Sequence, residues 1–296
     1  MSKFDQEVAP GYPVFLGSEF EHPKLEDAYF HILPVPFEAS VSYGGGTSFG
    51  PAAILEASWQ LESWDGKSVP GKRGIHTHPP INCKGDAEKV LARVSEGTEN
   101  IVNNGAFPIV LGGEHTVTYG VINGLIEAGI EDFGVIQIDA HADLRDSYEG
   151  NSLSHASVMR RIADLDIPIF QLGVRAMCEE EVQARKTYGI EYLDAEILIK
   201  KNIYKFDLPE DFPDKVFFTV DIDGFDPSVF PSTGTPVPGG LAWYQSLALF
   251  ESVAKQAQII GFDIMEFAPV EGFHAYEFSA SLLAYKMMGI IERNQL

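Results

Sequence analysis

Six acidic and imidazole side chains follow three short apolar runs of the sequence, with a spacing that suits metal binding. The six are His115, Asp139, His141, Asp143, Asp221 and Asp223. The runs that precede them are Phe107–Leu111, Phe133–Ile138 and Val216–Val220. Carboxylate oxygens with some imidazole and no thiolate are ligands that suit Mn²⁺ better than a structural zinc ion.

The charge of this set favours a pair of metal ions. Its four aspartates bring a charge of −4 and would repel one another strongly if they were crowded together. Two divalent cations would neutralise them before any bridging hydroxide is counted. The alternative is that Asp139 and Asp221 cap helices or turns and that His141 is an ordinary hydrogen-bonded residue. Either acidic segment alone leaves that alternative open, whereas both together with His115 favour a metal site.

Short apolar runs that alternate with helical patterns predict the elements that must position these side chains. Runs without polar alternation are typical of strands buried on both faces, and strand–helix alternation indicates a mostly parallel sheet covered by helices. The predicted strands are Tyr29–Val35, Phe107–Leu111, Phe133–Ile138, Ile167–Leu172, Val216–Val220 and Ile259–Ile264. The predicted helices are Pro51–Glu62, Asp86–Asn104, Thr116–Glu127, Ser154–Asp164, Glu179–Tyr188, Trp243–Gln256 and Ser279–Glu292.

The predicted strands also explain how distant residues meet. In extended backbone every second side chain points to the same side, so Asp139, His141 and Asp143 are expected to point together. The same period applies to Asp221 and Asp223. In a parallel sheet the chemistry gathers at the carboxyl ends of the strands, so both groups are expected at one edge.

Composition bounds the class of protein. The 296 residues are interpreted as an irregular N-terminal arm, residues 1–28, followed by one catalytic domain, residues 29–296. A net charge of −22 repels phosphate backbones, which argues against nucleic-acid binding, and attracts cations. No apolar run approaches the roughly 18 residues of a membrane helix, and the N-terminus lacks a signal-peptide pattern. We therefore expect a cytoplasmic protein without membrane association, in which Cys83 and Cys178 are free thiols.

Longer motifs around these residues resemble the ureohydrolase family of arginases and agmatinases. They are Gly-Gly-Glu-His-Thr at 112–116, Asp-Ala-His-Ala-Asp-Leu-Arg at 139–145, Ser-His-Ala-Ser at 154–157, Asp-Ile-Asp-Gly-Phe-Asp-Pro at 221–227 and Pro-Ser-Thr-Gly-Thr-Pro-Val-Pro-Gly-Gly-Leu at 231–241. The resemblance extends over residues 28–292. It implies a three-layer α/β/α sandwich with a mostly parallel sheet of about eight strands. It also implies two Mn²⁺ ions per subunit and a homotrimer or homohexamer.

The resemblance assigns the six residues to two ions by position. One ion would be ligated by His115, Asp139, Asp143 and Asp221. The other would be ligated by Asp139, His141, Asp221 and Asp223, so that Asp139 and Asp221 are shared. Coordination lowers the pKa of a bound water from 15.7 towards about 7, so a bridging hydroxide would attack the guanidinium carbon. The intermediate would then collapse to urea and an amine.

Further residues receive roles from the same resemblance. His155 matches the family's proton shuttle to the leaving nitrogen, Glu266 matches the carboxylate that binds the guanidinium, and Asp143 is counted with them as catalytic. Thr235 lies in a loop that contacts the substrate in relatives. The alternatives are that His155 is merely the first residue of a helix and that Thr235 belongs to a rigid turn.

The loop at residues 144–153 indicates the substrate. It lacks the Thr-Thr-Ser-Gly-Asn pattern of arginases and resembles the agmatinase loop, with Tyr-x-Gly running into Ser-His. Its Asp146 and Glu149 suit a distal ammonium group, although a solvated acidic loop is the alternative. We therefore expect a small cationic guanidino substrate, agmatine, hydrolysed to putrescine and urea. The segment after Glu266 departs from the Pro-x-Tyr-Asp type of many agmatinases, and Arg145 could pair a substrate carboxylate.

Two other functions stay open. The first is the same chemistry on arginine, 4-guanidinobutyrate or another guanidino compound. The second is a catalytically inactive metal-binding homologue, which is disfavoured because the six ligands, His155 and Glu266 are all present. His76 and His78 also have i,i+2 metal spacing. No acidic partner is evident for them in the sequence, so a Pro-rich loop is the favoured interpretation.

Overall fold

The centre of the molecule is an eight-stranded sheet. The computed structural model describes residue 9 and residues 11–296, so residues 1–8 and 10 of the predicted arm lie outside the described residues. The strands are β1 (Phe30–Val35), β2 (Ile75–Thr77), β3 (Phe107–Gly112), β4 (Gly134–Ile138), β5 (Ile169–Leu172), β6 (Glu191–Leu193), β7 (Lys215–Asp221) and β8 (Gln258–Met265). Their order is β2-β1-β3-β8-β7-β4-β5-β6, and every neighbouring pair is parallel. The expected parallel sheet of about eight strands is therefore confirmed.

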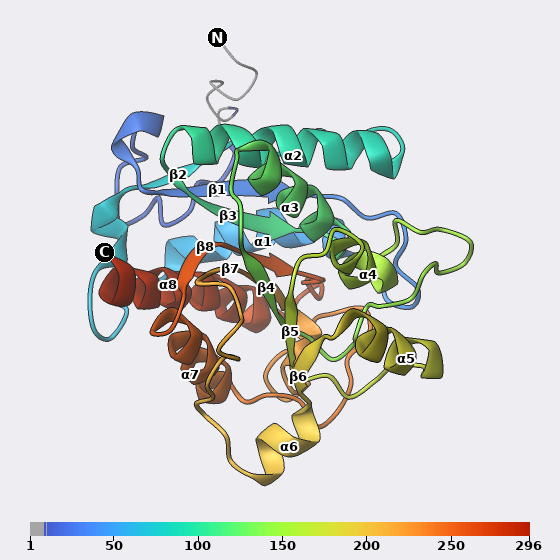
Figure 1. The fold of residues 1–296 in the computed structure, drawn as a ribbon. Coiled ribbons are helices and arrows are strands. Elements are labelled where there is room, and N and C mark those ends of the chain that lie inside the picture. Colours follow the sequence, from blue (N-terminus) through green and yellow to red (C-terminus); the bar gives the residue numbers. More distant parts are fainter. Residues whose placement is uncertain (1–8, 10) are drawn as a thin grey trace.

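Helices cover both faces of this sheet, which gives the three expected layers (Figure 1). The helices are α1 (Gly50–Ala57), α2 (Ala87–Asn103), α3 (Val117–Glu127), α4 (Val158–Ala163), α5 (Glu179–Tyr188), α6 (Ala195–Lys200), α7 (Trp243–Ala254) and α8 (Ala275–Gln295). Alternate strand residues face opposite layers. Ile136 packs in the cluster that includes α1, α7 and α8, whereas Val135 packs in the cluster of α2, α3 and α4. Apolar residues on both faces explain the unbroken apolar runs.

Edge elements are where the sequence patterns fell short. The strands β2 and β6 have only three residues each and include polar side chains, as in Glu191–Leu193, so no apolar run marked them. His76 lies in β2 and not in a Pro-rich loop. Helix α8 begins at Ala275, before the predicted Ser279. In the arm, Phe15 and Leu16 are buried against the core, so its described part packs onto the domain.

Four neighbouring strands in the middle of the sheet position the chemistry. In the order β3-β8-β7-β4 their carboxyl ends lead into His115, Glu266, Asp221 and Asp139. The chain thus delivers residues far apart in sequence to one edge, as expected for a parallel α/β sheet. Among the described residues, no helix has the length and apolar character needed to cross a membrane.

Candidate functional site

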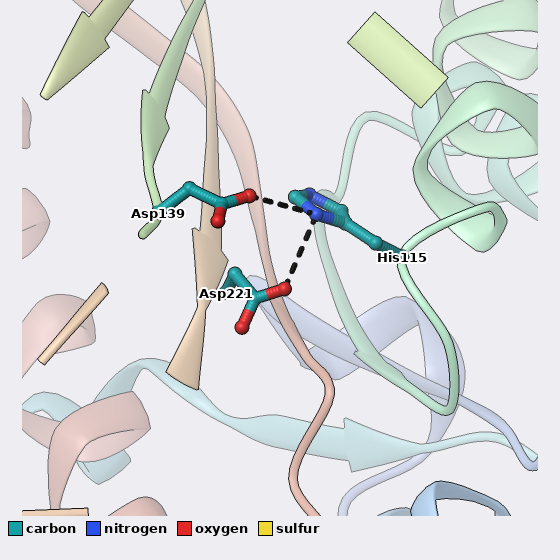
Figure 2. Close-up of side chains that lie close together, drawn as sticks. All are labelled: His115, Asp139 and Asp221. Atoms are coloured by element: carbon teal, nitrogen blue, oxygen red, sulfur yellow. Dashed lines mark ion pairs between the residues drawn. The ribbon is translucent and has the colours of Figure 1, made fainter. Parts of the chain in front are cut away.

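The six residues expected to bind metal meet at this edge. Within the described residues, two groups of side chains could hold a metal ion: His115 with Asp139 and Asp221, and Asp139 with His141 and Asp223. Figure 2 shows the first group, in which Asp139 and Asp221 both point at the ring of His115. The Nδ1 atom of His115 lies 3.2 Å from Asp139, 3.4 Å from Asp221 and 3.0 Å from Asp143.

The second group lies beside the first and shares Asp139 with it. The Nδ1 atom of His141 lies 3.0 Å from Oδ2 of Asp223 and 3.7 Å from Oδ1 of Asp139. Asp139 therefore belongs to both groups. Asp221, the other residue predicted to be shared, is part of the first group only.

Tight turns, and not continued strands, bring these ligands together. Strand β4 ends at Ile138 and β7 at Asp221. Asp139 then accepts a hydrogen bond from the backbone N–H of His141 at 2.6 Å, and Asp221 accepts one from that of Asp223 at 2.8 Å. Such aspartate-to-backbone bonds two residues on fold the chain back. The period-two argument expected these side chains to lie together because of extended backbone, whereas tight turns bring them together.

Asp143 adopts a strained backbone conformation. Its φ is +52°, in the left-handed region that non-glycine residues rarely occupy. Glu266, at the end of β8, has a φ of +60°. Left-handed conformations of this kind cost roughly 1–3 kcal/mol each and gather at functional sites. The two strained residues both line the same pocket, which is consistent with a site whose geometry is held at a cost in stability.

Burial and mutual repulsion shift the pKa values of this cluster. Burial, reinforced by Asp139, raises the pKa of Asp143 to about 7. Burial, followed by the charges of Asp223 and Asp139, raises the pKa of Asp221 well above its ordinary value. Burial opposes charge on an imidazole, yet Asp139 and Asp223 raise the pKa of His141 to about 12. The cluster therefore attracts positive charge, which is the electrostatic condition for holding a cation.

The hydrogen bonds of the His115 ring indicate whether these residues fit a metal ion. Its Nε2 atom lies 2.9 Å from the hydroxyl of Thr219, which lies 3.4 Å from the hydroxyl of Thr118. Thr118 in turn donates to Asp263 at 2.8 Å. A chain of donors can run from His115 to Oδ2 of Asp263 if Nε2 carries the proton. It leaves a lone pair on Nδ1.

That Nδ1 atom is the strongest indication of a cation. It is buried, makes no hydrogen bond to any described residue, and faces three carboxylates. A lone pair surrounded by carboxylate oxygens is repulsive unless a positive charge lies between them. The donor set of His115 and the aspartates therefore fits a metal ion.

A pocket of about 330 Å³ opens above the cluster. Its floor includes Asp143, Asp221, Asp223 and Glu266, and its walls come from several loops. The wall residues are Ser42, His141, Arg145, Tyr148, His155, Ala156, Ala176, Met177, Cys178, Glu181 and Thr235. Its size and its mixture of carboxylates with a few apolar groups suit a small polar ligand.

Glu266 is fixed at the base of this pocket. One carboxylate oxygen accepts a hydrogen bond from the backbone N–H of His115 at 2.7 Å. The side chain is buried, and burial raises the pKa of Glu266 well above its ordinary value. A cationic guanidinium in the pocket would offset that burial through charge-assisted hydrogen bonds.

His155 lies on the pocket wall, outside both metal-binding groups. It begins a single 3₁₀ turn, residues His155–Ser157, that leads into α4. Its ring packs edge-on against Tyr148, with 5.7 Å between ring centroids, and its backbone N–H donates to the hydroxyl of Ser40 at 3.0 Å. Burial lowers the pKa of His155 below its ordinary value. It can therefore be neutral near pH 7 and still exchange a proton.

The residues predicted to contact the substrate fall in different places. Thr235 lines the pocket and donates a hydrogen bond to Asp223 at 3.2 Å. Glu149 is exposed at the tip of a tight turn and is not among the residues that line the pocket. Asp146 forms an ion pair with Arg161 at 2.9 Å, away from the lining, whereas Arg145 is part of it.

One wall of the pocket was not foreseen. Residues 176–178 and Glu181 follow β5 and line the pocket beside His141. Glu181 accepts hydrogen bonds from the backbone N–H groups of Leu144 and Cys178, and so joins this wall to the loop after β4. The signal was available, since the predicted strand Ile167–Leu172 also ends at this edge. Cys178 and Glu181 lie six and nine residues beyond that strand and outside the sequence motifs, so no pattern in the sequence marks them.

The fold and the site define an α/β protein with a candidate metal-binding cluster at the floor of its pocket. The model of the arginase family matches residues 28–289. An N(1)-aminopropylagmatine ureohydrolase of Synechocystis sp. is 41% identical over 274 residues, which are 89% of each chain. An agmatinase of Pyrococcus horikoshii is 34% identical over 279 residues, covering 91% of this chain and 94% of its own.

A solved structure agrees with these sequences. The agmatine ureohydrolase of Thermoplasma volcanium superposes with a TM-score of 0.79 at 28% identity, covering 93% of this chain and 94% of its own. The chain belongs to the arginase family. The resemblance inferred from the motifs is thereby confirmed, and so is the expectation of a ureohydrolase-type enzyme.

Proposed function

We propose that this chain is a binuclear manganese ureohydrolase that cleaves the guanidinium group of agmatine-type substrates. The observation that carries the proposal is the pair of ligand groups joined at Asp139, directly below a pocket that also contains Glu266 and His155. Oxygen-rich ligation without thiolate supports Mn²⁺. The six assigned ligands are His115, Asp139, His141, Asp143, Asp221 and Asp223.

The residues divide the chemistry between them. The six assigned ligands would hold two ions, and such ions, when bound, would lower the pKa of a coordinated water so that hydroxide is available at neutral pH. Glu266 binds the guanidinium and orients its carbon toward the metal cluster, and Thr235, which also lines the pocket, donates a hydrogen bond to Asp223. His155 gives a proton to the leaving nitrogen, which must depart as an amine. Its position on the wall, clear of the ligand groups, supports that role.

The charge of the pocket supports a cationic tail on the substrate. Beyond the metal cluster the wall carries the carboxylate of Glu181, and the chain as a whole has a charge of −22. Agmatine brings an ammonium group to this wall, whereas arginine and 4-guanidinobutyrate bring a carboxylate. Arg145 is half-buried on the same wall and 4.0 Å from Glu181, so the two charges partly compensate each other and the charge of −22 on the chain decides the sign of the field. Agmatine is therefore favoured over the two acids.

A specific observation favours a second substrate, N(1)-aminopropylagmatine. The Synechocystis relative of that name is 41% identical to this chain, compared with 34% for the Pyrococcus agmatinase. An aminopropyl extension adds positive charge at the end of the molecule that would face the acidic wall.

Three further expectations stay predictions from the sequence. They are location in the cytoplasm, assembly as a homotrimer or homohexamer, and the division into an arm and a domain at residue 28.

A urea-release screen tests the proposal. The Mn²⁺-loaded protein is incubated with agmatine, N(1)-aminopropylagmatine, arginine, 4-guanidinobutyrate and guanidine, with the chelator-treated protein as control. We expect the largest kcat/KM for one of the two agmatines and no release after chelation. Absence of urea from all five compounds would contradict the proposed function, and preference for an acid would contradict only the choice of substrate.

A further inference from the structure

The two nitrogens of the His155 ring have different surroundings. The Nδ1 atom lies 3.2 Å from the hydroxyl oxygen of Ser40, which also accepts the backbone N–H of His155 at 3.0 Å. Among the described residues, the side-chain hydrogen bond of this ring is made through Nδ1 and not through Nε2. The side chain lines the pocket, so Nε2 is the nitrogen left to exchange protons there. Which nitrogen carries the proton in the neutral ring is decided by the Ser40 hydroxyl.

The single proton of that hydroxyl is already committed. Ser40 donates it to Oε1 of Glu114 at 2.9 Å. Glu114 is fully buried and accepts three other hydrogen bonds, from the backbone N–H groups of Ala39 at 2.5 Å and Ser40 at 2.6 Å and from the hydroxyl of Thr116 at 2.9 Å. Four donors around its two oxygens leave no site on Glu114 for a proton of its own. The Ser40 oxygen can therefore only accept from Nδ1.

We propose that Ser40, held by Glu114, is a positioning residue that fixes the tautomer of His155 with its proton on Nδ1. This inference rests on the proposed function, in which His155 serves the leaving nitrogen. With Nδ1 protonated, neutral His155 offers a lone pair on Nε2 to the pocket, and the imidazolium offers an Nε2 proton. Both states of the shuttle then act through the same atom.

A purely structural role for these bonds makes a different prediction. Glu114 joins the end of β3 to residues 39 and 40, and this link alone would stabilise the loop without influencing protons. In that case loss of the Ser40 hydroxyl would lower the melting temperature and leave kcat of the folded enzyme unchanged. If Ser40 sets the tautomer, kcat falls while KM and metal content stay constant.

Three variants separate these roles. Ser40→Ala removes the acceptor, and we expect kcat to fall about 10–100-fold, a part of the 10²–10⁴-fold that a positioned acid or base contributes. Ser40→Thr keeps the hydroxyl and should recover most of that loss. Ser157→Ala is the matched control, since this buried serine lies on the same turn but bonds to Ser154 and not to the His155 ring. It should lower kcat far less than Ser40→Ala.

The tautomer is read directly, without turnover. Protein labelled with ¹⁵N-histidine and loaded with diamagnetic Zn²⁺ is studied by NMR, and His155→Asn assigns the ring signals of His155. We expect the neutral ring to carry its proton on Nδ1, and to lose that preference in Ser40→Ala. A neutral ring protonated on Nε2, or an unchanged kcat in folded Ser40→Ala, would overturn the proposal. If the wild type releases no urea, only the proposed function fails, and the NMR result still decides on Ser40.

Discussion

Two buried sets of polar side chains in this sheet share the same i,i+2 spacing and behave in opposite ways. The central acidic cluster comprises the six candidate metal ligands at the ends of β3, β4 and β7. The edge histidine cluster comprises His31 of β1, His76 of β2 and His78, which follows β2. In the register of the two edge strands His31 pairs directly with His76. Spacing alone therefore cannot tell a metal site from a packed edge.

The edge histidine cluster is held together by uncharged hydrogen bonds. The rings of His31 and His78 are bonded through Nδ1 and Nε2 at 2.9 Å, and Nε2 of His31 is bonded to the carbonyl of Leu25 at 3.1 Å. His76 is bonded through Nδ1 to the carbonyl of Pro23 at 3.0 Å. The three rings pack against one another in tilted or edge-on arrangements, with centroids 4.8–5.3 Å apart. Neutral imidazoles can satisfy one another in this way.

The pKa values of the buried histidines shift in opposite directions in the two clusters. Burial lowers the pKa of His31 to about 4, because no carboxylate contacts its ring among the described residues. Burial acts in the same direction on His115, but contacts with Asp139, Asp143 and Asp221 raise its pKa well above its ordinary value. Buried histidines that contact carboxylates favour a positive charge between the side chains. Buried histidines that lack carboxylate partners stay neutral. Both groups able to hold metal in the described chain belong to the first kind.

The largest expected effect is loss of the central cluster through its shared carboxylate. Asp139→Asn should disturb the binding of both ions and lower kcat by more than about 10⁴-fold. The reason is that bound metal ions lower the pKa of a coordinated water from 15.7 to about 7, and this effect is lost with the ions. Asp223→Asn should chiefly weaken one ion. His76→Asn, in the edge histidine cluster, is the control and should leave the metal content of the purified protein unchanged. Full occupancy of both sites in an active Asp139→Asn would contradict the assignment of Asp139 as a bridge.

The next effect separates chemistry from metal binding inside the pocket. His155→Asn should keep both ions, because His155 lies outside the two ligand groups, and should lower kcat by roughly 10²–10⁴-fold. Metal analysis and steady-state kinetics on the same preparation measure both quantities. Loss of metal in this variant would mean that His155 is a ligand and not the proton shuttle.

A smaller effect tests the edge histidine cluster through pH. Since the pKa of His31 is about 4 in the folded chain and about 6.5 when unfolded, the unfolded state binds more protons between these values. The contribution of neutral His31 to the free energy of unfolding is fully present above pH 6.5 and is lost as the pH falls to 4. The loss is about 3 kcal/mol, from 1.36 kcal/mol per pKa unit. Among the described residues, His76 and His78 face the His31 ring, and the charge of Glu26 acts on His76.

Denaturant titrations at pH 7, 5.5 and 4.5 measure that loss. His31→Phe removes the titrating ring, so the dependence of unfolding free energy on pH should become shallower over this range, whatever the absolute stability of the variant. His274→Phe is the matched control at an exposed position and should keep the wild-type slope. Equal slopes in all three proteins would show that the edge cluster is not an uncharged packing unit.

The sequence predicted the parts of the molecule in which local pattern and global fold agree. The central strands could be predicted because both faces of runs such as Val216–Val220 are buried, and the candidate ligands could be placed at one edge of the sheet because they follow those runs. The edge strands β2 and β6 could not be predicted, because three residues that include polar side chains carry no periodic hydrophobic signal. The pairing of His31 with His76 was invisible for the same reason, because it depends on the register between β1 and β2.

Side-chain partners set by tertiary contacts were equally hidden. Ser40 and Glu114 are 74 residues apart, and nothing local in the sequence joins them. Glu149 shows the reverse case, since its place in an acidic loop suggested a contact with the substrate but the structure places it outside the pocket lining. Tyr148 and Asn151 exchange two backbone hydrogen bonds at 2.9 Å around Glu149 and Gly150, both with positive φ. This turn resembles type I′, places Tyr148 on the pocket wall and leaves Glu149 at the exposed tip.

The smallest effect concerns how far the acidic field of the central site extends along that loop. A carboxylate substrate near Glu149 would cost about 1 kcal/mol at a screened surface, or about fivefold in kcat/KM. Because Glu149 is exposed at the tip, Glu149→Gln should narrow the preference for agmatine over 4-guanidinobutyrate by no more than this factor. Asp146→Asn is the matched control, since it makes the same change of charge on the same loop at a residue already paired with Arg161. An equal change of substrate preference in both variants would attribute the effect to net charge. A larger kcat/KM for 4-guanidinobutyrate than for agmatine in the wild type would contradict the choice of substrate and leave the description of the central acidic cluster unchanged.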